Sequence, residues 1–478
     1  MSALEVALNC FEKITQKFNN KDCCVLGFGR SNKPLAKMLC EAGARVLVCD
    51  GKDEARDDEF ISLGVKFCTG GNYLSGVGGD YVFRSPGIRH DIDAIEKAKA
   101  EGACLTSEME LFFELCPATL IGITGSDGKT TTTTLTHLFL KKELEKRGEG
   151  AAYVGGNIGQ PLLPIVDKMS ENDYAVVELS SFQLQTMTQS PRRALITNIS
   201  PNHLNWHTDY EEYSEAKYNI CRHDGLQMLV TNADYEKTRE IADEMTVPVT
   251  YFSSKRHSYA DIVPKNKKNA LAIYEDGGVI YVDGGDSREA VLSVSDILLP
   301  GVHNMENYMA AIGLTRGLVS SETVREIART FGGVEHRLEF VRELDGVKYY
   351  NSSIDSSPSR TMAALGALEV KPIIICGGAE KGIEFDELAD ALCKRTKSVV
   401  LTGATAQKIY DKIMDSEYYD ARALPVCIVQ DFRDAVLYAN SIASDGDVVL
   451  LSPACTSFDR FRDFEHRGNY FKEIVKQL

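Results

Sequence analysis

The segment "IGITGSDGKTTTTTL", from Ile121 to Leu135, places small polar residues, one lysine and five threonines after a β-branched run. Gly125, Gly128, Lys129 and Thr130 have the composition of a phosphate-binding loop between a strand and a helix. In such loops backbone N–H groups surround the phosphates, the lysine reaches the β and γ oxygens, and the threonine hydroxyl binds Mg²⁺. Ile123 stands where the pattern G-x-x-x-x-G-K-[ST] has its first glycine, which predicts a loop of different shape. A glycine turn before an ordinary helix is the alternative.

An acid, a histidine and a lysine farther along the chain are candidate metal ligands. Glu178 ends the apolar stretch "YAVVE", where a carboxylate could face the phosphate loop and bind Mg²⁺, or could simply be solvated. His203, in "NISPNHLNWH", follows another predicted strand and could contact metal or phosphate or be structural. Lys217, in "YSEAK", cannot bind Mg²⁺ as an ammonium ion, but a CO₂ adduct on its amine would supply carboxylate oxygens. A solvated helix lysine is the alternative.

Other polar groups cluster toward the C-terminus. Asn304 and Asn307 lie one helical turn apart in "GVHNMENYMAA" and therefore share a helix face. Arg337, in "GGVEHRLE", could pair with a phosphate across a cleft. A last set of residues would suit a small anionic ligand, or could equally belong to ordinary loops. It provides a hydroxyl, an amine, a guanidinium and aromatic rings, and consists of Lys381, Ser457, Phe458, Phe464 and Arg467.

The elements that must position these groups begin with a Rossmann-like half. The segment "CCVLGFGRSNKPLAKMLCEAGARVLVCD" predicts strand, glycine turn, helix and strand, ending on Asp50. Asn32 replaces the third glycine of G-x-G-x-x-G, so a dinucleotide is only weakly indicated and another nucleotide is at least as plausible. The turn Ser85-Pro86-Gly87 follows a further strand and is expected at the same sheet edge.

The strand–helix rhythm restarts twice, which predicts three α/β domains. We place them at residues 1–112, Rossmann-like; 113–333, a central P-loop ATPase-type domain with a largely parallel sheet; and 334–478, a second Rossmann-like α/β domain. Within the central domain, "ALAIYEDGGVIYVDGG" has a different rhythm and predicts a β-hairpin.

Composition narrows the class of protein. The chain has 478 residues, 44% of them hydrophobic, so several folded domains are expected. A formal net charge of -16 argues against a nucleic-acid-binding surface. The thirteen cysteines form no C-x-x-C pair, which indicates reduced thiols. The N-terminus predicts an amphipathic helix without a signal peptide, and no apolar run could span a bilayer, so a cytoplasmic protein is expected.

The order of the motifs resembles the Mur ligase family. The resemblance rests on "GITGSDGKTTTTTL", "GGNIG", "VVELSSFQLQ", "ITNISPNHLNWH", "YSEAK", "GVHNMENYMAA", "VEHRLEF" and "LLSPACTSFDRFRDFEHRG", and it covers the chain from about Cys23 onward. In that family the P-loop has the form T-G-x-x-G-K-T, so Ile123 is no defect. The segments "ELSSFQL" and "SPGI" resemble the branch that adds D-glutamate to UDP-N-acetylmuramoyl-L-alanine.

The resemblance implies an ATP-dependent ligase of peptidoglycan precursor synthesis, a pathway tied to cell shape and division. Phosphorylation of the substrate carboxylate would give an acyl phosphate, which the amine of D-glutamate attacks. Bringing three ligands into contact geometry is the main task of such an enzyme. The resemblance further implies two Mg²⁺ ions, a carbamylated Lys217 and a monomer that binds small molecules, with no nucleic acid and no membrane.

The resemblance carries site residues over one by one. It implies catalytic roles for Lys129, Lys217 and His203, and metal binding by Thr130, Glu178, His203 and Lys217. ATP contacts would come from Gly125, Ser126, Asp127, Gly128, Lys129, Thr130, Thr131, Asn304, Asn307 and Arg337. The UDP-sugar would meet Gly29, Arg30, Ser31, Asp50, Gly87, Asn157 and Gln183, and D-glutamate would meet Lys381, Ser457, Phe458 and Phe464.

Two segments depart from the family pattern. Where many members have "NDSKATN", this chain has "NSSIDSS", so Ser352 and Ile354 replace an acid and a lysine, which leaves the ribose contact of ATP open. Asp355 could replace that acid in a shifted register. Asn202 and Asn205 flank His203 where aspartates are frequent, which removes negative charge near the second metal.

Rival functions remain open from the sequence alone. A sister ligase that adds another amino acid, or an enzyme similar to folylpolyglutamate synthetase, would carry nearly the same motifs. An NAD-dependent dehydrogenase built on the first domain is a second class, against which Asn32 and Lys129 weigh. A nucleotide-binding sensor that has lost turnover is a third.

Overall fold

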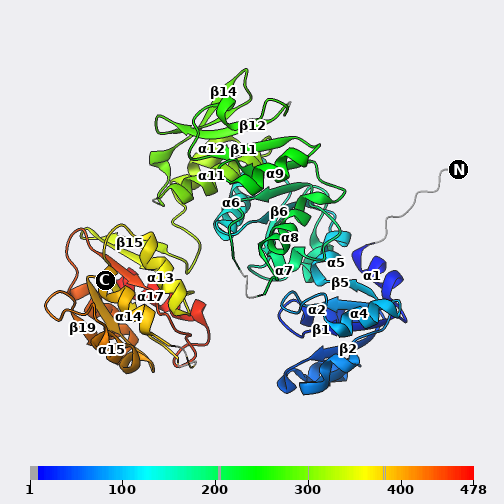
Figure 1. Cartoon of the computed structure of the whole chain (residues 1–478), viewed down its shortest axis with the longest axis horizontal. Coiled ribbons are helices and arrows are strands. Elements are labelled where there is room, and N and C mark those ends of the chain that lie inside the picture. Colours follow the sequence, from blue (N-terminus) through cyan, green and yellow to red (C-terminus); the bar gives the residue numbers. More distant parts are fainter. Residues whose placement is uncertain (1–8, 203–205, 268, 300, 380–381, 383) are drawn as a thin grey trace. The chain divides into compact units, whose positions relative to one another are not determined.

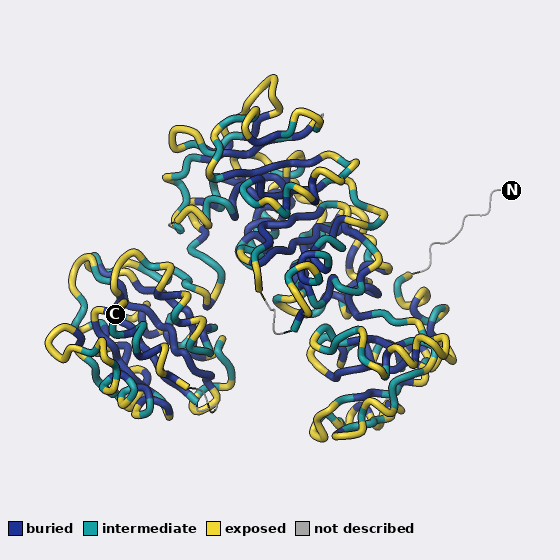
Figure 2. The backbone as a smooth tube through the Cα atoms, in the orientation of Figure 1, coloured by how far each residue is buried: buried dark blue, intermediate teal, exposed yellow. Residues whose placement is uncertain are grey.

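The chain folds into two compact units, Met1–Thr330 and Phe331–Leu478. The computed structural model describes residues 9–202, 206–267, 269–299, 301–379, 382 and 384–478 (Figure 1). The first unit contains two parallel-rich sheets and the second contains one, all with helices between the strands, so the α/β class is confirmed. The central strands of each sheet are mostly buried, whereas edge strands are partly exposed and many connecting loops are exposed (Figure 2). Among the described residues, no helix is long and apolar enough to cross a bilayer.

The first sheet of the larger unit is fully parallel, with strand order β3-β2-β1-β4-β5. Its elements, in chain order, are α1 (Cys10–Phe18), β1 (Asp22–Leu26), α2 (Asn32–Glu41), β2 (Arg45–Asp50), η1 (Asp53–Ala55), α3 (Asp58–Ser62), β3 (Lys66–Thr69), η2 (Gly70–Gly76), β4 (Tyr81–Arg84), α4 (Asp93–Ala100), β5 (Cys104–Thr106) and α5 (Glu108–Leu115). The predicted strand–turn–helix–strand segment is confirmed as β1, α2 and β2. Asn9 caps α1 through a capping box with Glu12.

The second sheet has nine strands in the order β14-β13-β12-β11-β10-β9-β6-β8-β7. Its elements are β6 (Thr119–Thr124), α6 (Lys129–Arg147), β7 (Ala152–Gly156), η3 (Leu163–Lys168), β8 (Tyr174–Glu178), α7 (Ser181–Leu184), β9 (Arg193–Ile196), α8 (Tyr210–Arg222), β10 (Met228–Asn232), α9 (Glu236–Glu244), β11 (Val249–Ser253), α10 (Tyr259–Ile262), β12 (Leu271–Asp276), β13 (Val279–Asp283), β14 (Arg288–Ser293), η4 (Val294–Asp296), α11 (Val302–Thr315) and α12 (Ser321–Ala328). The predicted hairpin is confirmed as β12–β13. A third antiparallel strand, β14, pairs with β13 and was not predicted from the sequence.

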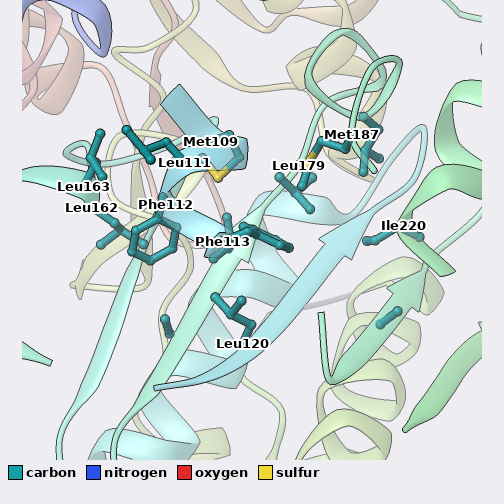
Figure 3. Packing of buried hydrophobic residues seen from close by; sticks show 14 of the residues in the cluster. Met109, Leu111, Phe112, Phe113, Leu120, Leu162, Leu163, Leu179, Met187 and Ile220 are labelled. Atoms are coloured by element: carbon teal, nitrogen blue, oxygen red, sulfur yellow. The ribbon is translucent and has the colours of Figure 1, made fainter. Parts of the chain in front are cut away.

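One hydrophobic core runs from the first sheet into the second. It includes Val25 and Val48 of the first sheet and Val177 and Ile196 of the second. Helix α5 supplies Met109, Leu111, Phe112 and Phe113, which lie near Leu120, Leu162 and Leu163 (Figure 3). A predicted domain boundary near residue 113 therefore falls inside a packed helix, and it stays a prediction.

The second unit contains a six-stranded sheet with the order β15-β16-β20-β17-β18-β19. Its elements are β15 (Glu339–Leu344), β16 (Val347–Asn351), α13 (Pro358–Ala367), β17 (Ile373–Cys376), α14 (Asp386–Arg395), β18 (Ser398–Leu401), α15 (Ala406–Asp415), β19 (Val426–Ile428), α16 (Phe432–Ser441), β20 (Val448–Leu451) and α17 (Phe464–Gln477). The sequence predicts five strands here, each ending on small or polar residues, in "VKYYNSS", "PIIICGG", "SVVLTGA", "PVCIVQD" and "DVVLLSP". All five are present as β16 to β20 and are parallel, and β15 adds an antiparallel edge.

The cysteines agree with the expectation of reduced thiols. All thirteen lie in the described part of the chain, and none forms a disulfide.

Candidate active site

The loop between β6 and α6 has a backbone that glycine alone can follow easily. Gly125 and Gly128 have φ angles of 147° and 79°. A Cβ atom on Gly125 would lie 1.8 Å from Thr197 Oγ1, and one on Gly128 would lie 2.5 Å from Asn307 Oδ1. The two glycines are therefore required both by the chain's conformation and by side chains that press against it.

Side chains from distant parts of the sequence hold this loop in place. Asp127 N donates to Asn198 Oδ1 at 3.0 Å, and Thr197 Oγ1 donates to Asp127 O at 2.6 Å. The Ser126 hydroxyl lies 2.8 Å from the hydroxyl of Tyr213 and donates to Ser200 O at 2.9 Å. A loop with so many bonds is already shaped before a ligand arrives, so little ordering entropy is lost on binding.

Lys129 is the first residue of α6 and bends back over the loop. Its Nζ donates to Gly125 O and Ser126 O, both at 2.9 Å. The ammonium group thus lies beside the loop's backbone, where a phosphate would be surrounded by N–H groups. Thr130 and Thr131 follow in the first helical turn.

Lys217 is buried and does not lie on a solvated helix face. It is 2% exposed, and its Nζ donates to Gly125 O at 2.7 Å and to Thr124 Oγ1 at 3.4 Å. Burial, and next the nearby Lys129 ammonium, hold the pKa of the Lys217 amine well below its usual range, although Asp127 and Glu178 oppose the shift. An uncharged amine is the form that reacts with CO₂, so this environment suits the proposed carbamate.

Glu178 ends β8 beside the phosphate loop, since it pairs in register with Ile123 of β6. It is 1% exposed, and its Oε1 accepts a hydrogen bond from Asn157 Nδ2 at 2.9 Å. Its Oε2 is buried and accepts no hydrogen bond from the described residues. A buried carboxylate oxygen without a partner is costly unless a cation or donor reaches it.

This carboxylate fits a magnesium ion. Mg²⁺ prefers oxygen ligands and is commonly held by one or two carboxylates together with phosphate oxygens. Thr130, in the first turn of α6, is the hydroxyl that would complete such a site. In the described part of the chain, this site included, no group of three or more His, Cys, Asp and Glu side chains gathers as a metal site.

The predicted metal ligand His203 lies outside the described residues, as does Asn205. Sequence reasoning missed a second histidine four residues later, His207, which is 2% exposed. Its Nε2 lies 2.9 Å from Ser181 Oγ, and its ring stacks on Phe182 with centroids 5.6 Å apart. The signal available in the sequence was the repeated histidine in "NHLNWH".

Four of the seven residues expected to contact the UDP-sugar line one pocket. The pocket has a volume of about 170 Å³ and is lined by Arg30, Ser31, Asn157 and Gln183, together with Pro86, Gly156, Gly159 and Pro161. The last four were missed, although "GGNIGQP" contains three of them. Gly29 and Gly87 are chain neighbours of lining residues.

Asp50, which the resemblance places at the uridine nucleotide, is hydrogen-bonded within the protein. Its carboxylate accepts hydrogen bonds from Phe28 N at 2.7 Å and Lys52 N at 2.9 Å. It therefore joins the turns that follow β1 and β2. Gln183 is also engaged locally, because its Oε1 accepts bonds from Ser180 N and Ser180 Oγ in a capping box.

The two asparagines of α11 play different parts. Asn307 is buried, and its Oδ1 accepts from Thr132 Oγ1 at 3.1 Å beside Gly128. It therefore connects α11 to the start of α6. Asn304 is half-buried, and its Nδ2 lies 3.2 Å from His303 Nε2.

The second unit carries the remaining predicted contacts. Arg337 is exposed and lies between His336 and Leu338, whose φ angles are 63° and 44°. Positive φ at two residues that are not glycine marks a strained turn, which fixes the position of the Arg337 backbone. Ser457 is buried, Phe458 is 68% exposed, and Phe464 begins α17. Lys381 lies outside the described residues.

Two polar residues of this unit point inward. Arg467 is 2% exposed and donates to Ser353 O at 2.9 Å and to Cys455 O at 3.1 Å, so it holds loops together. Asp355 is 6% exposed and accepts from Ser452 Oγ at 2.8 Å. Burial raises the pKa of this carboxyl. Ser352, which replaces the family's acid, is 1% exposed.

Comparison with known proteins gives a consistent result. The Mur ligase middle domain matches residues 123–315, and the Mur ligase glutamate ligase domain matches residues 336–455. The UDP-N-acetylmuramoylalanine–D-glutamate ligase of Acetivibrio thermocellus is 44% identical over 483 residues, covering 99% of this chain and 100% of the relative. The ligase of the same name from Clostridium acetobutylicum is 43% identical, covering 98% and 99%.

Solved structures are similar in fold at low identity. The UDP-N-acetylmuramoyl-L-alanyl-D-glutamate–2,6-diaminopimelate ligase has a TM-score of 0.52 at 17% identity, over 91% of this chain and 87% of that one. MurF from Acinetobacter baumannii has a TM-score of 0.52 at 15% identity, over 97% and 92%. These likenesses concern the fold alone.

Proposed function

This chain belongs to the Mur ligase family, and we propose that it joins D-glutamate to UDP-N-acetylmuramoyl-L-alanine at the expense of ATP. The observation that carries this proposal is the 44% identity, over nearly the whole of both chains, to a relative with this name. The phosphate loop beside a buried carboxylate and a buried lysine supports the same chemistry.

The reaction makes an amide from a carboxylate, which is a poor acyl donor in water. The alanyl carboxylate oxygen bonds to the γ-phosphorus of ATP and ADP leaves, which gives an acyl phosphate. The amine nitrogen of D-glutamate then attacks the acyl carbon, phosphate leaves, and the amine releases a proton. Most of the catalysis is therefore positioning and charge stabilisation.

The central loop supplies the charge stabilisation. Residues Gly125 to Thr131 offer backbone N–H groups to the ATP phosphates, and Lys129 exchanges its carbonyl partners for phosphate oxygens. Thr130 and Glu178 would hold one Mg²⁺, while His203 and a carbamylated Lys217 would hold a second. When bound, the metal ions neutralise the approach of carboxylate to phosphate.

The remaining contacts are those that the resemblance to the family implies, in a three-domain layout that we propose with boundaries near residues 113 and 334. Residues 1–112 bind the uridine nucleotide through Gly29, Arg30, Ser31, Asp50 and Gly87, and Asn157 and Gln183 of the central domain bind the muramoyl-alanine arm. Asn304, Asn307 and Arg337 contact ATP. Lys381, Ser457, Phe458 and Phe464 contact D-glutamate. We propose a cytoplasmic monomer.

Phosphate release from ATP tests the proposal. The assay contains the full-length chain, Mg²⁺, UDP-N-acetylmuramoyl-L-alanine and, in separate reactions, D-glutamate, L-glutamate, L-lysine or diaminopimelate. Release with D-glutamate alone supports the proposal. Release with L-lysine or diaminopimelate but not D-glutamate would assign a sister ligase, and no turnover with tight ATP binding would favour the sensor. Binding of NAD with hydride transfer would favour the dehydrogenase.

A further inference from the structure

Two arginines on the turn after β4 fasten the first sheet to the second. Arg84, the last residue of β4, is 1% exposed. Its Nη1 donates to Ile88 O at 2.6 Å within the same turn, and its Nη2 donates to Phe182 O at 2.9 Å and Thr186 Oγ1 at 3.2 Å. One guanidinium group therefore binds the turn of residues 85–88 and helix α7 together.

Arg89, directly after that turn, reaches helix α8 and the segment that precedes it. Its Nη1 donates to Trp206 O at 2.7 Å, and its Nη2 donates to Glu212 Oε1 at 2.9 Å. The Asp91 carboxylate also accepts two hydrogen bonds from this guanidinium, from Nε at 2.8 Å and from Nη2 at 2.7 Å. The planar fork of arginine makes such multiple bonds possible, whereas a lysine would offer one point charge.

Glu212 of α8 accepts hydrogen bonds from several side chains around Arg89. It accepts hydrogen bonds from Gln185 Nε2 at 2.7 Å and Thr208 Oγ1 at 3.0 Å in addition to those from Arg89. Although burial opposes the shift, hydrogen bonds from Arg89 and Thr208 lower the pKa of Glu212 to about 2. The carboxylate stays charged at neutral pH, so the ion pair with Arg89 persists.

The only tryptophan of the sequence lies inside this set of contacts. The Trp206 ring lies 5.2 Å from the Arg89 guanidinium and 4.5 Å, centroid to centroid, from Phe182. Its Nε1 donates to Gly87 O at 3.4 Å. The turn of the first sheet is thus covered by an aromatic side chain of the second, which adds dispersion and cation–π attraction.

These contacts join the two walls of the UDP-sugar pocket. Pro86, in the turn, and Gln183, in α7, both line that pocket. Phe182, the chain neighbour of Gln183, is bonded by Arg84 and packed against Trp206. A shift of the turn relative to α7 would therefore change the distance between the walls.

We propose that Arg84 and Arg89 are positioning residues for the sugar nucleotide, because they hold the turn of residues 85–88 against α7 and the segment 206–212 before the ligand binds. This inference rests on the proposed function, which supplies the ligand. A site assembled in advance loses less entropy on binding than one that must be ordered by its ligand. The two arginines need not touch the ligand to exert this effect.

Intrinsic fluorescence of the full-length chain measures the effect directly, because Trp206 is the single reporter. UDP-N-acetylmuramoyl-L-alanine is titrated into wild type, Arg89→Ala, Arg89→Lys and Glu212→Gln, and the Kd is read from the emission change. Isothermal calorimetry repeats each Kd, and KM for the sugar nucleotide and for ATP is measured in the phosphate-release assay.

We expect Arg89→Ala to raise the Kd for the sugar nucleotide about 10- to 100-fold, with KM for ATP within about twofold of wild type. Arg89→Lys should recover part of the affinity, since it keeps the charge and loses the fork. Glu212→Gln, which keeps the shape of the side chain and so avoids unfolding, should raise the Kd several-fold.

Arg45→Ala is the matched control. Arg45 binds Asp22 through two bonds of 2.7 Å, but that pair is exposed at the amino ends of β1 and β2. Its Kd should equal that of wild type. Unchanged Kd in both Arg89→Ala and Glu212→Gln would overturn the positioning role, even if thermal stability fell. No binding by wild type would overturn the proposed function as well, which separates the two failures.

Discussion

Two strand-to-helix turns in this chain are both rich in glycine but have different surroundings. The turn after β1 reads Gly27-Phe28-Gly29-Arg30-Ser31 and leads into α2, while the turn after β6 reads Gly125-Ser126-Asp127-Gly128 and leads into α6. In the first, a Cβ placed on Gly27 would lie 2.7 Å from Ser85 Cβ, but nothing lies within 4 Å of one placed on Gly29, and Arg30 is exposed. In the second, Thr197 and Asn307 press on both glycines.

The neighbouring carboxylates show the same difference. Asp50, beside the first turn, has backbone N–H partners from Phe28 and Lys52. Glu178, beside the second, keeps one buried oxygen without a partner among the described residues. Glycine spacing indicates a turn in both places. Enclosure of both glycines and a buried carboxylate oxygen without a partner among the described residues support the phosphate and metal site that we propose at the second. Six substitutions, in four experiments, test this comparison.

Lys129→Ala should have the largest effect. Loss of the ammonium group beside the phosphate loop should lower kcat by on the order of 10³-fold, because charge that develops on the phosphate is no longer stabilised. Circular dichroism and the midpoint of thermal unfolding should match wild type, since the hydrogen bonds from Lys129 Nζ to Gly125 O and Ser126 O lie within the loop itself. Activity within tenfold of wild type would contradict the role.

Gly125→Ala and Gly29→Ala contrast the two turns directly. The added methyl group on residue 125 would meet Thr197 Oγ1 at 1.8 Å at a φ of 147°, so the loop must distort. We expect ATP affinity, measured by calorimetry, to fall by about 100-fold. Gly29→Ala has open space, and its ATP affinity should not change. Equal losses in the two variants would show that enclosure does not distinguish the turns.

Lys217→Ala should lower kcat by roughly 100-fold, as expected for loss of a metal ligand. Acetate or propionate should restore part of the activity, because a free carboxylate can occupy the space of the carbamate beside Gly125. The check is phosphate release at increasing carboxylate concentration, with chloride of equal ionic strength as the control. Full activity without any addition would remove the carbamate from the mechanism.

Glu178→Gln and Asp50→Asn should separate metal binding from structure. The first should weaken Mn²⁺ binding about 10- to 100-fold, measured by electron paramagnetic resonance without any turnover, and leave thermal stability unchanged or higher. The second should cost about 1–2 kcal/mol of unfolding free energy, because Phe28 N and Lys52 N lose a charged acceptor. Mn²⁺ affinity unchanged in Glu178→Gln would refute the assignment.

Much of the fold could be predicted from the sequence because hydrophobic periodicity and turn residues are local signals. The strands β1, β6, β8 and β16 to β20 were visible as apolar runs that end on small or polar residues. The edge strands β14 and β15 were missed, because antiparallel edges carry mixed polar sequences such as "REAVLS" that lack a clear pattern.

The sequence alone determined the phosphate loop, because strand, loop, lysine and helix are contiguous, and it determined the order of motifs that marks the family. Only the tertiary structure decided that Lys217 is buried against Gly125 and that one oxygen of Glu178 has no partner among the described residues. It also decided that Arg89 binds Glu212, 123 residues away. Desolvation and pairing depend on residues distant in sequence that the fold brings together, and no local pattern encodes them.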